Sequence, residues 1–155
     1  MKKFASMIAI ALLATSMLVS SCKDDDPAPS KTDLLTAKSW VVSAGEIEYS
    51  GQRFPYPAIV QDCDKDDVTT FTKDGKFTTN VGTVLCDTEK NYGGVWQFKE
   101  NDTILALKED GETDFDENTI TVLTDSKLEI FIEEFNYDVN GTKVKAKTYL
   151  IFKTK

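Results

Sequence analysis

From about residue 40 onward, hydrophobic and polar positions alternate over short segments, which is the pattern of half-buried β-strands. The alternation is clearest in residues 143–153, where four apolar residues fall on one side, Val144, Ala146, Leu150 and Phe152, and four lysines on the other. The segments are rich in Val, Ile, Thr, Phe and Tyr, and turn residues separate them. The predicted strands are Trp40–Tyr49, Val68–Thr72, Phe77–Val81, Gly94–Lys99, Ile104–Lys108, Thr119–Leu123, Leu128–Tyr137 and Lys143–Lys153.

Short turns connect these segments directly. Asp74-Gly75 lies between two strand-like runs, and Asn140-Gly141 closes the last and longest pair; both dipeptides favour tight hairpin turns. In the segment Leu128–Tyr137, the alternation changes phase before Phe135, which predicts a β-bulge near Glu133-Glu134.

About eight short strands joined in sequence, without a long helical period, predict an all-β, up-and-down antiparallel meander. Closing the sheet into a barrel removes its exposed edges and lines the interior with alternate side chains. A sandwich of two sheets is the alternative, because periodicity alone does not separate the two. Before the first strand, the capping residues Thr32-Asp33 predict one short helical turn over Leu34–Ser39.

The first 32 residues have a different pattern. Lys2 and Lys3 precede the apolar run Phe4–Val19, which predicts a secretory signal peptide over residues 1–21 that is removed from the mature chain. An uncleaved membrane anchor is the alternative, but a spanning helix needs about 20 apolar residues and this run is shorter. Residues 22–32 are polar and contain prolines, so we expect a tether that leads to one domain over residues 33–155.

The junction Val19-Ser20-Ser21-Cys22 resembles the lipobox of bacterial lipoproteins, in which the cysteine becomes the acylated first residue. This resemblance implies that acyl chains such as palmitate on Cys22 attach the protein to a membrane. An ordinary signal peptide cut nearby is the alternative. The following run Lys23–Asp26 is similar to an export tag that directs some lipoproteins to the exterior face of the outer membrane, with a periplasm-facing anchor as the alternative.

The chain is acidic, with 26 Asp and Glu against 18 Lys and Arg. Without the two lysines of the predicted signal peptide, the net charge is 16 − 26 = −10. Nucleic-acid-binding proteins display basic surfaces toward the phosphate backbone, so we expect no nucleic-acid partner. The same charge disfavours docking of the domain on an anionic membrane surface, which leaves the lipid on Cys22 as the expected membrane contact.

Several short motifs occur along the domain in a characteristic order and spacing: Leu34-Leu35 before Trp40, Asp62–Asp67 leading into Thr70–Phe77, Cys86, Gly94-Val95-Trp96, and Ser126-Lys127-Leu128. Together they resemble the lipocalin-like domain family of bacterial lipoproteins. The similarity covers about Leu34–Lys155 and implies a lipocalin-like barrel. Lys38 departs from the Gly-X-Trp motif that typical lipocalins carry at the first strand, so the resemblance does not imply their ligands.

Cys63 and Cys86 are the two cysteines of the predicted domain. In an exported protein such a pair usually forms a structural disulfide, which we predict here. A zinc site is disfavoured because the chain has no histidine. The acidic run Asp62–Asp67 is similar in part to a calcium loop, but Asp67 replaces the required glycine and Lys73 replaces the closing acid. We therefore expect a solvated acidic loop and predict no metal or cofactor.

Four aromatic residues are the candidate ligand contacts: Trp40, Phe54, Tyr56 and Trp96. Phe54 and Tyr56 lie in the proline-stiffened segment Arg53–Pro57, which either forms a lid or stacking platform or plugs one end of the barrel. The two tryptophans either fill the interior or contact a ligand within it.

Catalytic motifs are missing from the sequence. The chain contains no histidine, the usual general base at neutral pH, and no Gly-X-Ser-X-Gly motif. We therefore predict a non-enzymatic, lipid-anchored surface protein that binds a small, mostly apolar molecule in the barrel. The alternative is a surface interaction or structural protein whose loops contact a protein or glycan. Binding requires a cavity of a few hundred Å³, whereas the alternative predicts a core packed solid.

Overall fold

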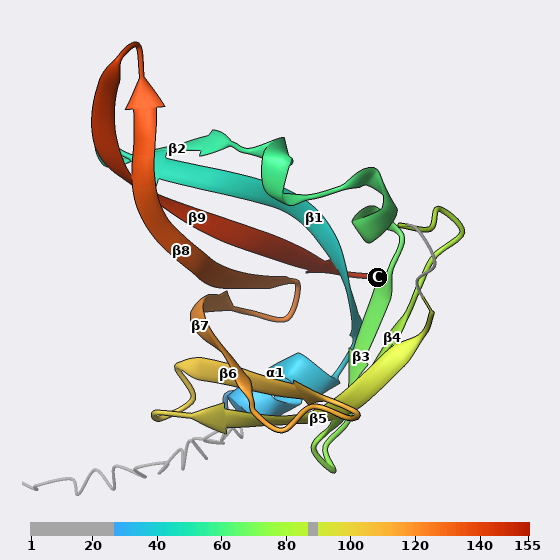
Figure 1. Cartoon of the computed structure of the whole chain (residues 1–155). Helices are drawn as coiled ribbons and strands as arrows, with labels where there is room; N and C mark the ends of the chain where they lie inside the picture. Colours follow the sequence, from blue (N-terminus) through green and yellow to red (C-terminus); the bar gives the residue numbers. More distant parts are fainter. Residues whose placement is uncertain (1–26, 87–89) are drawn as a thin grey trace, which may run out of the picture.

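A single antiparallel sheet of nine strands, curled into a ring, makes up most of the described part of the protein (Figure 1). The computed structural model describes residues 27–86 and 90–155, so the predicted signal peptide and Cys22 lie outside the described residues. The strands are β1 (Ser39–Tyr49), β2 (Gln52–Pro55), β3 (Val68–Phe71), β4 (Lys76–Asn80), β5 (Tyr92–Lys99), β6 (Ile104–Glu109), β7 (Asp116–Leu123), β8 (Lys127–Val139) and β9 (Thr142–Thr154). Within these described ranges, no helix combines the length and apolarity that a membrane crossing would require.

Strand β1 closes the ring. Its first residues, Ser39 and Trp40, pair with β3, while its other edge pairs with β9 from Trp40 to Tyr49. The remaining strands pair in sequence order from β3 to β9, each antiparallel to the next. The predicted up-and-down antiparallel meander is therefore confirmed, and the sheet is one continuous ring rather than a two-sheet sandwich.

The structure contains one strand that the sequence analysis did not predict, β2. It lies in the proline-stiffened segment after the first long strand. It pairs with the second half of β1, from Glu46 to Tyr49. The connection is the pair Ser50-Gly51, with φ values of +51° and +74°. Two consecutive residues with positive φ form the tight turn whose twist matches a two-stranded hairpin. Asn140-Gly141, the predicted turn between β8 and β9, has the same signs of φ.

The short helix α1 (Lys31–Thr36) starts earlier than the predicted span Leu34–Ser39 because its cap is Ser30. The Ser30 hydroxyl accepts a hydrogen bond from the Asp33 amide at 3.1 Å, and the Asp33 carboxylate accepts one from the Ser30 amide. This capping box fixes the first turn. Leu35 is fully buried against the core, and the Trp40 indole Nε1 donates to the Leu35 carbonyl at 2.8 Å. The helix thus closes one end of the ring.

Strand β8 contains a bulge between Phe131 and Glu133, just before the predicted position. The extra residue, Ile132, is exposed at the surface. Beyond the bulge, Phe135 pairs with Ala146 and Tyr137 with Val144. The phase change therefore keeps Phe135 and Tyr137 on the inner face of the sheet.

The core lies at the end of the ring that α1 closes. Trp96 packs edge-to-face on Phe71 and on Phe98, with ring centroids 5.8 and 5.3 Å apart. Such aromatic pairs add to the energy of apolar burial. The buried cluster consists of Leu35, Trp40, Phe71, Phe77, Trp96, Leu105, Leu128 and Ile130.

Candidate functional site

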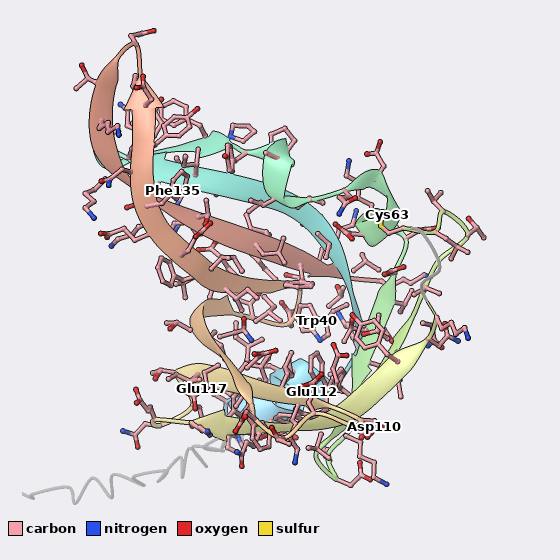
Figure 2. The ribbon with its side chains drawn as sticks, viewed as in Figure 1. Trp40, Cys63, Asp110, Glu112, Glu117 and Phe135 are labelled. Carbon is pink, nitrogen blue, oxygen red and sulfur yellow. A yellow bond between two sulfur atoms is a disulfide. The ribbon has the colours of Figure 1, made fainter. Side chains whose placement is uncertain are left out.

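A cavity of about 410 Å³ lies inside the ring, above the core. Trp40 lies on its wall, and Figure 2 shows this side chain inside the ring. Polar side chains gather toward the end opposite α1, where Tyr92 begins β5 and Glu109 ends β6. The apolar part of the wall consists of Trp40, Phe71, Phe77, Leu105, Leu107, Leu128, Ile130 and Phe152.

The strand register explains why polar groups face this cavity. Directly opposed residues of an antiparallel pair lie on the same face of the sheet. Asp116 pairs with Leu107 and Asn118 with Leu105, so both polar residues share the inner face with these leucines. On β3 and β4, the inward hydroxyls of Thr69 and Thr79 hydrogen-bond to each other at 2.9 Å. The cavity therefore has an apolar floor and a polar upper wall.

A second hollow of about 300 Å³ adjoins the first and shares Trp40, Thr79 and Tyr92 with it. Its outer side is formed by Ile59 of η1 (Pro57–Ile59) and by Asp64 of η2 (Asp62–Lys65). The segment after β2 thus covers part of the interior. This covering role belongs to the short 3₁₀ helices rather than to the aromatic residues of Arg53–Pro57.

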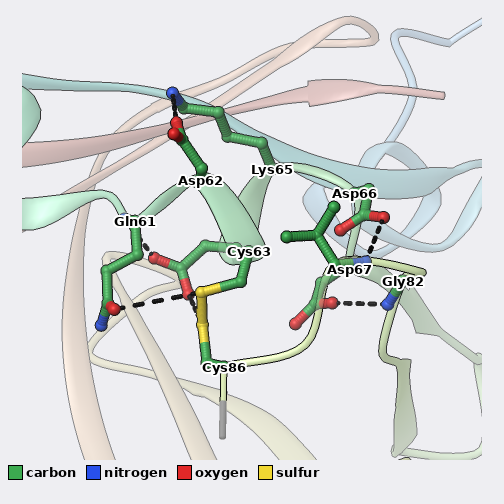
Figure 3. The surroundings of a disulfide bond; sticks show 10 residues. Gln61, Asp62, Cys63, Lys65, Asp66, Asp67, Gly82 and Cys86 are labelled. Carbon is green, nitrogen blue, oxygen red and sulfur yellow. Dashed lines mark hydrogen bonds and ion pairs between the residues drawn. A yellow bond between two sulfur atoms is a disulfide. The ribbon is translucent and has the colours of Figure 1, made fainter.

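The predicted disulfide joins Cys63 of η2 to Cys86, with the Cα atoms 5.5 Å apart (Figure 3). The bridge ties η2 to the segment after β4. Closing a loop of this size stabilises the fold by roughly 3 kcal/mol in the chain-entropy description. The three-residue group Cys63, Asp64 and Cys86 brings potential metal ligands together, but both sulfur atoms belong to the disulfide.

The acidic loop beside this bridge binds main-chain amides. Asp66 Oδ2 accepts hydrogen bonds from the amides of Thr83 at 2.7 Å and Val84 at 3.2 Å, which lower the pKa of its carboxyl. Asp67 Oδ1 accepts from the Gly82 amide at 2.7 Å. The expectation of a solvated loop therefore holds for Asp62, which is exposed, but not for Asp66 and Asp67.

Phe54 and Tyr56 lie away from the residues that line the cavity. They form an aromatic cluster with Tyr49, Phe135 and Tyr137 on the β8–β9 hairpin and its neighbours. The Tyr49 and Phe54 rings stack at 4.8 Å, and the Tyr56 and Tyr137 rings meet edge-to-face at 6.2 Å. Of the four candidate aromatics, Trp40 lines the cavity, and Trp96 packs in the core below it.

The residues that the sequence analysis missed are the polar ones at the top of the cavity. Asp116 and Asn118 have the same parity as Ile120, which packs against the core from the predicted strand Thr119–Leu123. Extending the period-two pattern backward along the chain would have placed both on the inner face. Tyr92 and Glu109 lie just outside the predicted strands Gly94–Lys99 and Ile104–Lys108, so their orientation was not assigned.

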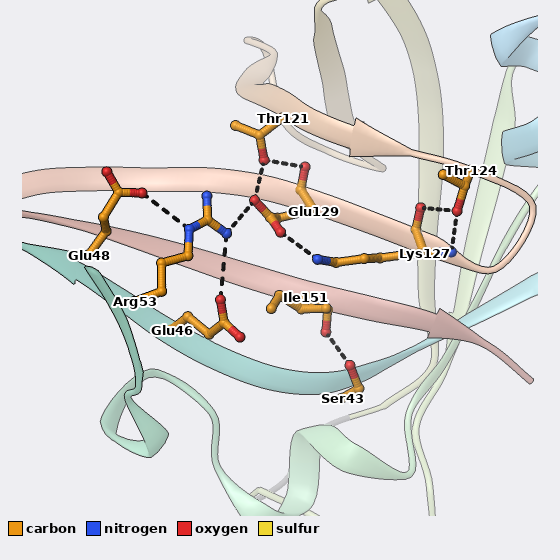
Figure 4. Close-up of polar contacts among 9 residues, drawn as sticks. All are labelled: Ser43, Glu46, Glu48, Arg53, Thr121, Thr124, Lys127, Glu129 and Ile151. Carbon is orange, nitrogen blue, oxygen red and sulfur yellow. Dashed lines mark hydrogen bonds and ion pairs between the residues drawn. The ribbon is translucent and has the colours of Figure 1, made fainter. Parts of the chain in front are cut away.

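A buried carboxylate on the outer face of the ring belongs to a separate network (Figure 4). Glu129 on β8 is 1 % exposed and accepts hydrogen bonds from Arg53 at 2.8 Å, Lys127 at 2.7 Å and Thr121 at 2.7 Å. Burial opposes the charged form, but these donors outweigh it and lower the pKa of Glu129. The Arg53 guanidinium also lies over the Tyr149 ring, 3.9 Å from its centroid. Because its partners satisfy one another, we assign this network to holding β2, β8 and β9 together.

In a comparison with known families, the family model described as a lipocalin-like domain matches residues 36–130. This range runs from the last residue of α1 to the first residues of β8, and it includes most of the residues that line the cavity. No curated protein matches the chain.

Proposed function

The chain belongs to the lipocalin-like domain family, and from this premise we propose that it binds a small, mostly apolar molecule inside the ring without catalysing a reaction. The observation that carries the proposal is the cavity of about 410 Å³ with its apolar floor. Pockets for small molecules typically measure about 300–1,000 Å³ and are lined mainly by apolar and aromatic side chains. The family supports the same conclusion, since lipocalin-like proteins are generally binding proteins.

The alternative function is a surface interaction or structural protein with a filled ring. Phe77 and Trp96 do fill the end near α1, but the space above them counts against a solid core. Contacts of the loops with a protein or glycan are compatible with either function. The two functions therefore differ in whether a molecule enters the ring.

Ligand binding is tested with the neutral apolar probe N-phenyl-naphthylamine, whose fluorescence rises on transfer from water to an apolar site. We expect saturable binding to the predicted mature chain, residues 22–155, carrying Cys22→Ser. This protein has neither the apolar run Phe4–Val19 nor an acylation site, which permits detergent-free buffer. Leu107→Trp places an indole on the inner face and should weaken binding at least about tenfold by occupying the cavity. Lys108→Trp is the matched control, because it adds the same group to the opposite face of β6.

Two results would contradict the proposal. One is the absence of saturable probe binding to the Cys22→Ser protein that carries no further substitution. The other is equal binding by Leu107→Trp and the control Lys108→Trp, with both variants shown to be folded by circular dichroism. Equal binding would place the probe on the surface rather than in the ring.

We further propose that a lipid on Cys22 anchors the protein to the outer membrane with the domain facing the exterior; a periplasmic orientation is the alternative. The support is the lipobox-like Val19–Cys22 and the acidic run Lys23–Asp26. An alkynyl fatty acid supplied to a gram-negative host should label the unsubstituted chain, which keeps Cys22, and should not label the Cys22→Ser variant. Protease treatment of intact cells should then degrade the domain. Equal labelling of both proteins would exclude acylation at Cys22, and protection from protease would favour the periplasmic orientation.

A further inference from the structure

Tyr92 marks the point where the hollows of the ring meet. It lines the main cavity, the adjoining hollow under η1 and η2, and an outer groove of about 450 Å³ beside β4 and β5. Its side chain is 44 % exposed at the start of β5. A molecule entering the ring from the end opposite α1 therefore passes this aromatic ring.

The charges around the three hollows have one sign. The chain contains 18 Lys and Arg, yet none of those in the described ranges lines any of the hollows. Figure 2 shows two of the lining acids, Asp110 after β6 and Glu117 on β7. The lining carboxylates belong to Asp64, Asp67, Glu109, Asp110, Asp116 and Glu117.

Some of these carboxylates already have protein partners. Glu117 forms an ion pair with Lys99 at 2.6 Å, Asp64 accepts from the Gln61 amide at 2.7 Å, and Asp67 accepts from the Gly82 amide. Glu109 and Asp116 differ. Across residues 27–86 and 90–155, neither carboxylate takes part in an ion pair or a hydrogen bond with another protein group.

The sheet register directs these two acids toward the cavity. Asp116 pairs with the cavity-lining Leu107, and Glu109 pairs with Gly94, which pairs in turn with the cavity-lining Phe77. All of these residues share the inner face. Because Gly94 has no side chain, Glu109 has no bulky cross-strand neighbour on β5.

Two carboxylates beside an exposed tyrosine suit a cationic group. Charge-assisted hydrogen bonds to carboxylates are stronger than neutral ones, and an ammonium is also attracted to the face of an aromatic ring. An anionic group at the same place would meet like charges without a compensating cation. These three side chains form the rim of the cavity. The apolar floor below the rim favours a ligand whose remaining part, its body, is apolar.

We propose that the cavity selects amphiphiles whose apolar body ends in an amine or another cation, held at the rim by Glu109, Asp116 and Tyr92. This inference rests on the proposed binding function and specifies its ligand class. In this proposal, the apolar floor of the cavity binds the apolar body of the ligand, and the rim selects ligands by the charge of their head group.

The test compares three naphthalene derivatives of similar size by isothermal titration calorimetry: naphthylmethylamine, naphthylmethanol and naphthoic acid. On the predicted mature chain, residues 22–155, with Cys22→Ser, we expect the cation to bind about tenfold more tightly than the neutral alcohol at low salt, and the anion most weakly. The preference should shrink as salt is raised, because the rim is open to solvent. Glu109→Gln combined with Asp116→Asn should remove the preference and keep binding of the alcohol.

The control removes the same number of charges from residues that do not line the cavity, by Glu112→Gln with Asp114→Asn. It should retain the full cation preference. Equal affinity for the three compounds, or loss of the preference in the control as well, would overturn the inference while leaving alcohol binding as support for the proposed function. If none of the compounds binds, both fail. Thermal unfolding of each variant shows whether a loss of binding comes from the site or from unfolding. The salt dependence of binding to the Cys22→Ser protein gives a second measure of the preference for cations.

Discussion

Replacing Glu129 by alanine is expected to lower the free energy of unfolding by about 3 kcal/mol, because it removes the buried centre of an ion network. Lys127 then loses its ion-pair partner, while Arg53 keeps its pairs with Glu46 and Glu48. The Glu129 carboxylate joins Arg53 of β2 to Lys127 and to Thr121 of β7. The loss stays near the lower end for buried ion pairs because Arg53 and Lys127 are partly exposed and can be hydrated. Chemical denaturation by urea, followed by circular dichroism, measures the effect.

Glu134→Ala is the matched control on the same strand. Glu134 is exposed and forms an ion pair with Lys145 at 3.5 Å, so its loss should cost less than about 1 kcal/mol. Similar losses in the two variants would show that Glu129 contributes no more than a surface carboxylate. That result would contradict the assignment of the network to holding β2 and β8 together.

The same network predicts a dependence of stability on pH. The pKa of Glu129 is lowered in the folded protein, so the unfolded chain binds the proton more readily. The resulting stabilisation is fully present above the ordinary glutamate pKa of about 4.5 and is lost as pH falls through the folded value. Asp33 also has a lowered pKa, of about 2, mainly because of hydrogen bonds from Lys73 and Ser30. Its effect on the pH dependence of stability is the same with and without the Glu129→Ala substitution. The difference in stability between the starting protein and Glu129→Ala should therefore shrink on acidification; a constant difference would contradict this origin.

Local patterns predicted most of the ring, and long-range contacts account for what they missed. Asn140-Gly141 and the phase change before Phe135 are local signals, and they located the last hairpin and its bulge. Strand β2 was missed although it pairs with the neighbouring β1, because its segment contains Pro55 and Pro57 and so resembles a loop. A contact distant in sequence also holds it, since Arg53 reaches Glu129, 76 positions further along the chain.

The candidate site was predictable to a similar degree. Trp40 was predicted either to fill the interior or to contact a ligand there, and it does line the cavity. The interior position of Asp116 contradicts the usual pattern of apolar residues inside and polar residues outside. Only the pairing of β6 with β7 reveals it. Phe54 and Tyr56 have the composition of a lid, but their partners Tyr49 and Tyr137 hold them in the aromatic cluster instead.

Trp40 also provides the prediction with the largest expected effect on stability. Its side chain is 1 % exposed and packs between α1 and the ring. Trp40→Ala should cost about 3–5 kcal/mol through lost burial and the cavity left behind. Trp40→Phe keeps most of the packing but removes the donor to the Leu35 carbonyl. Leu35 is fully buried, so this carbonyl has no access to water. An unsatisfied buried acceptor costs about 1–3 kcal/mol, so this variant should lie between the alanine variant and the starting protein.

Trp96→Phe is the control that separates the hydrogen bond from the change in ring size. The Trp96 indole also donates to a carbonyl, that of Thr72 at 3.1 Å, but Thr72 is exposed and water can replace the lost donor. Both substitutions remove the same atoms from the same aromatic core, so the loss of packing largely cancels in the comparison. Urea denaturation should then rank the losses as Trp40→Ala, Trp40→Phe and Trp96→Phe, from largest to smallest. If Trp96→Phe costs as much as Trp40→Phe, the bond to Leu35 does not hold α1 against the ring, and packing alone closes this end of the cavity.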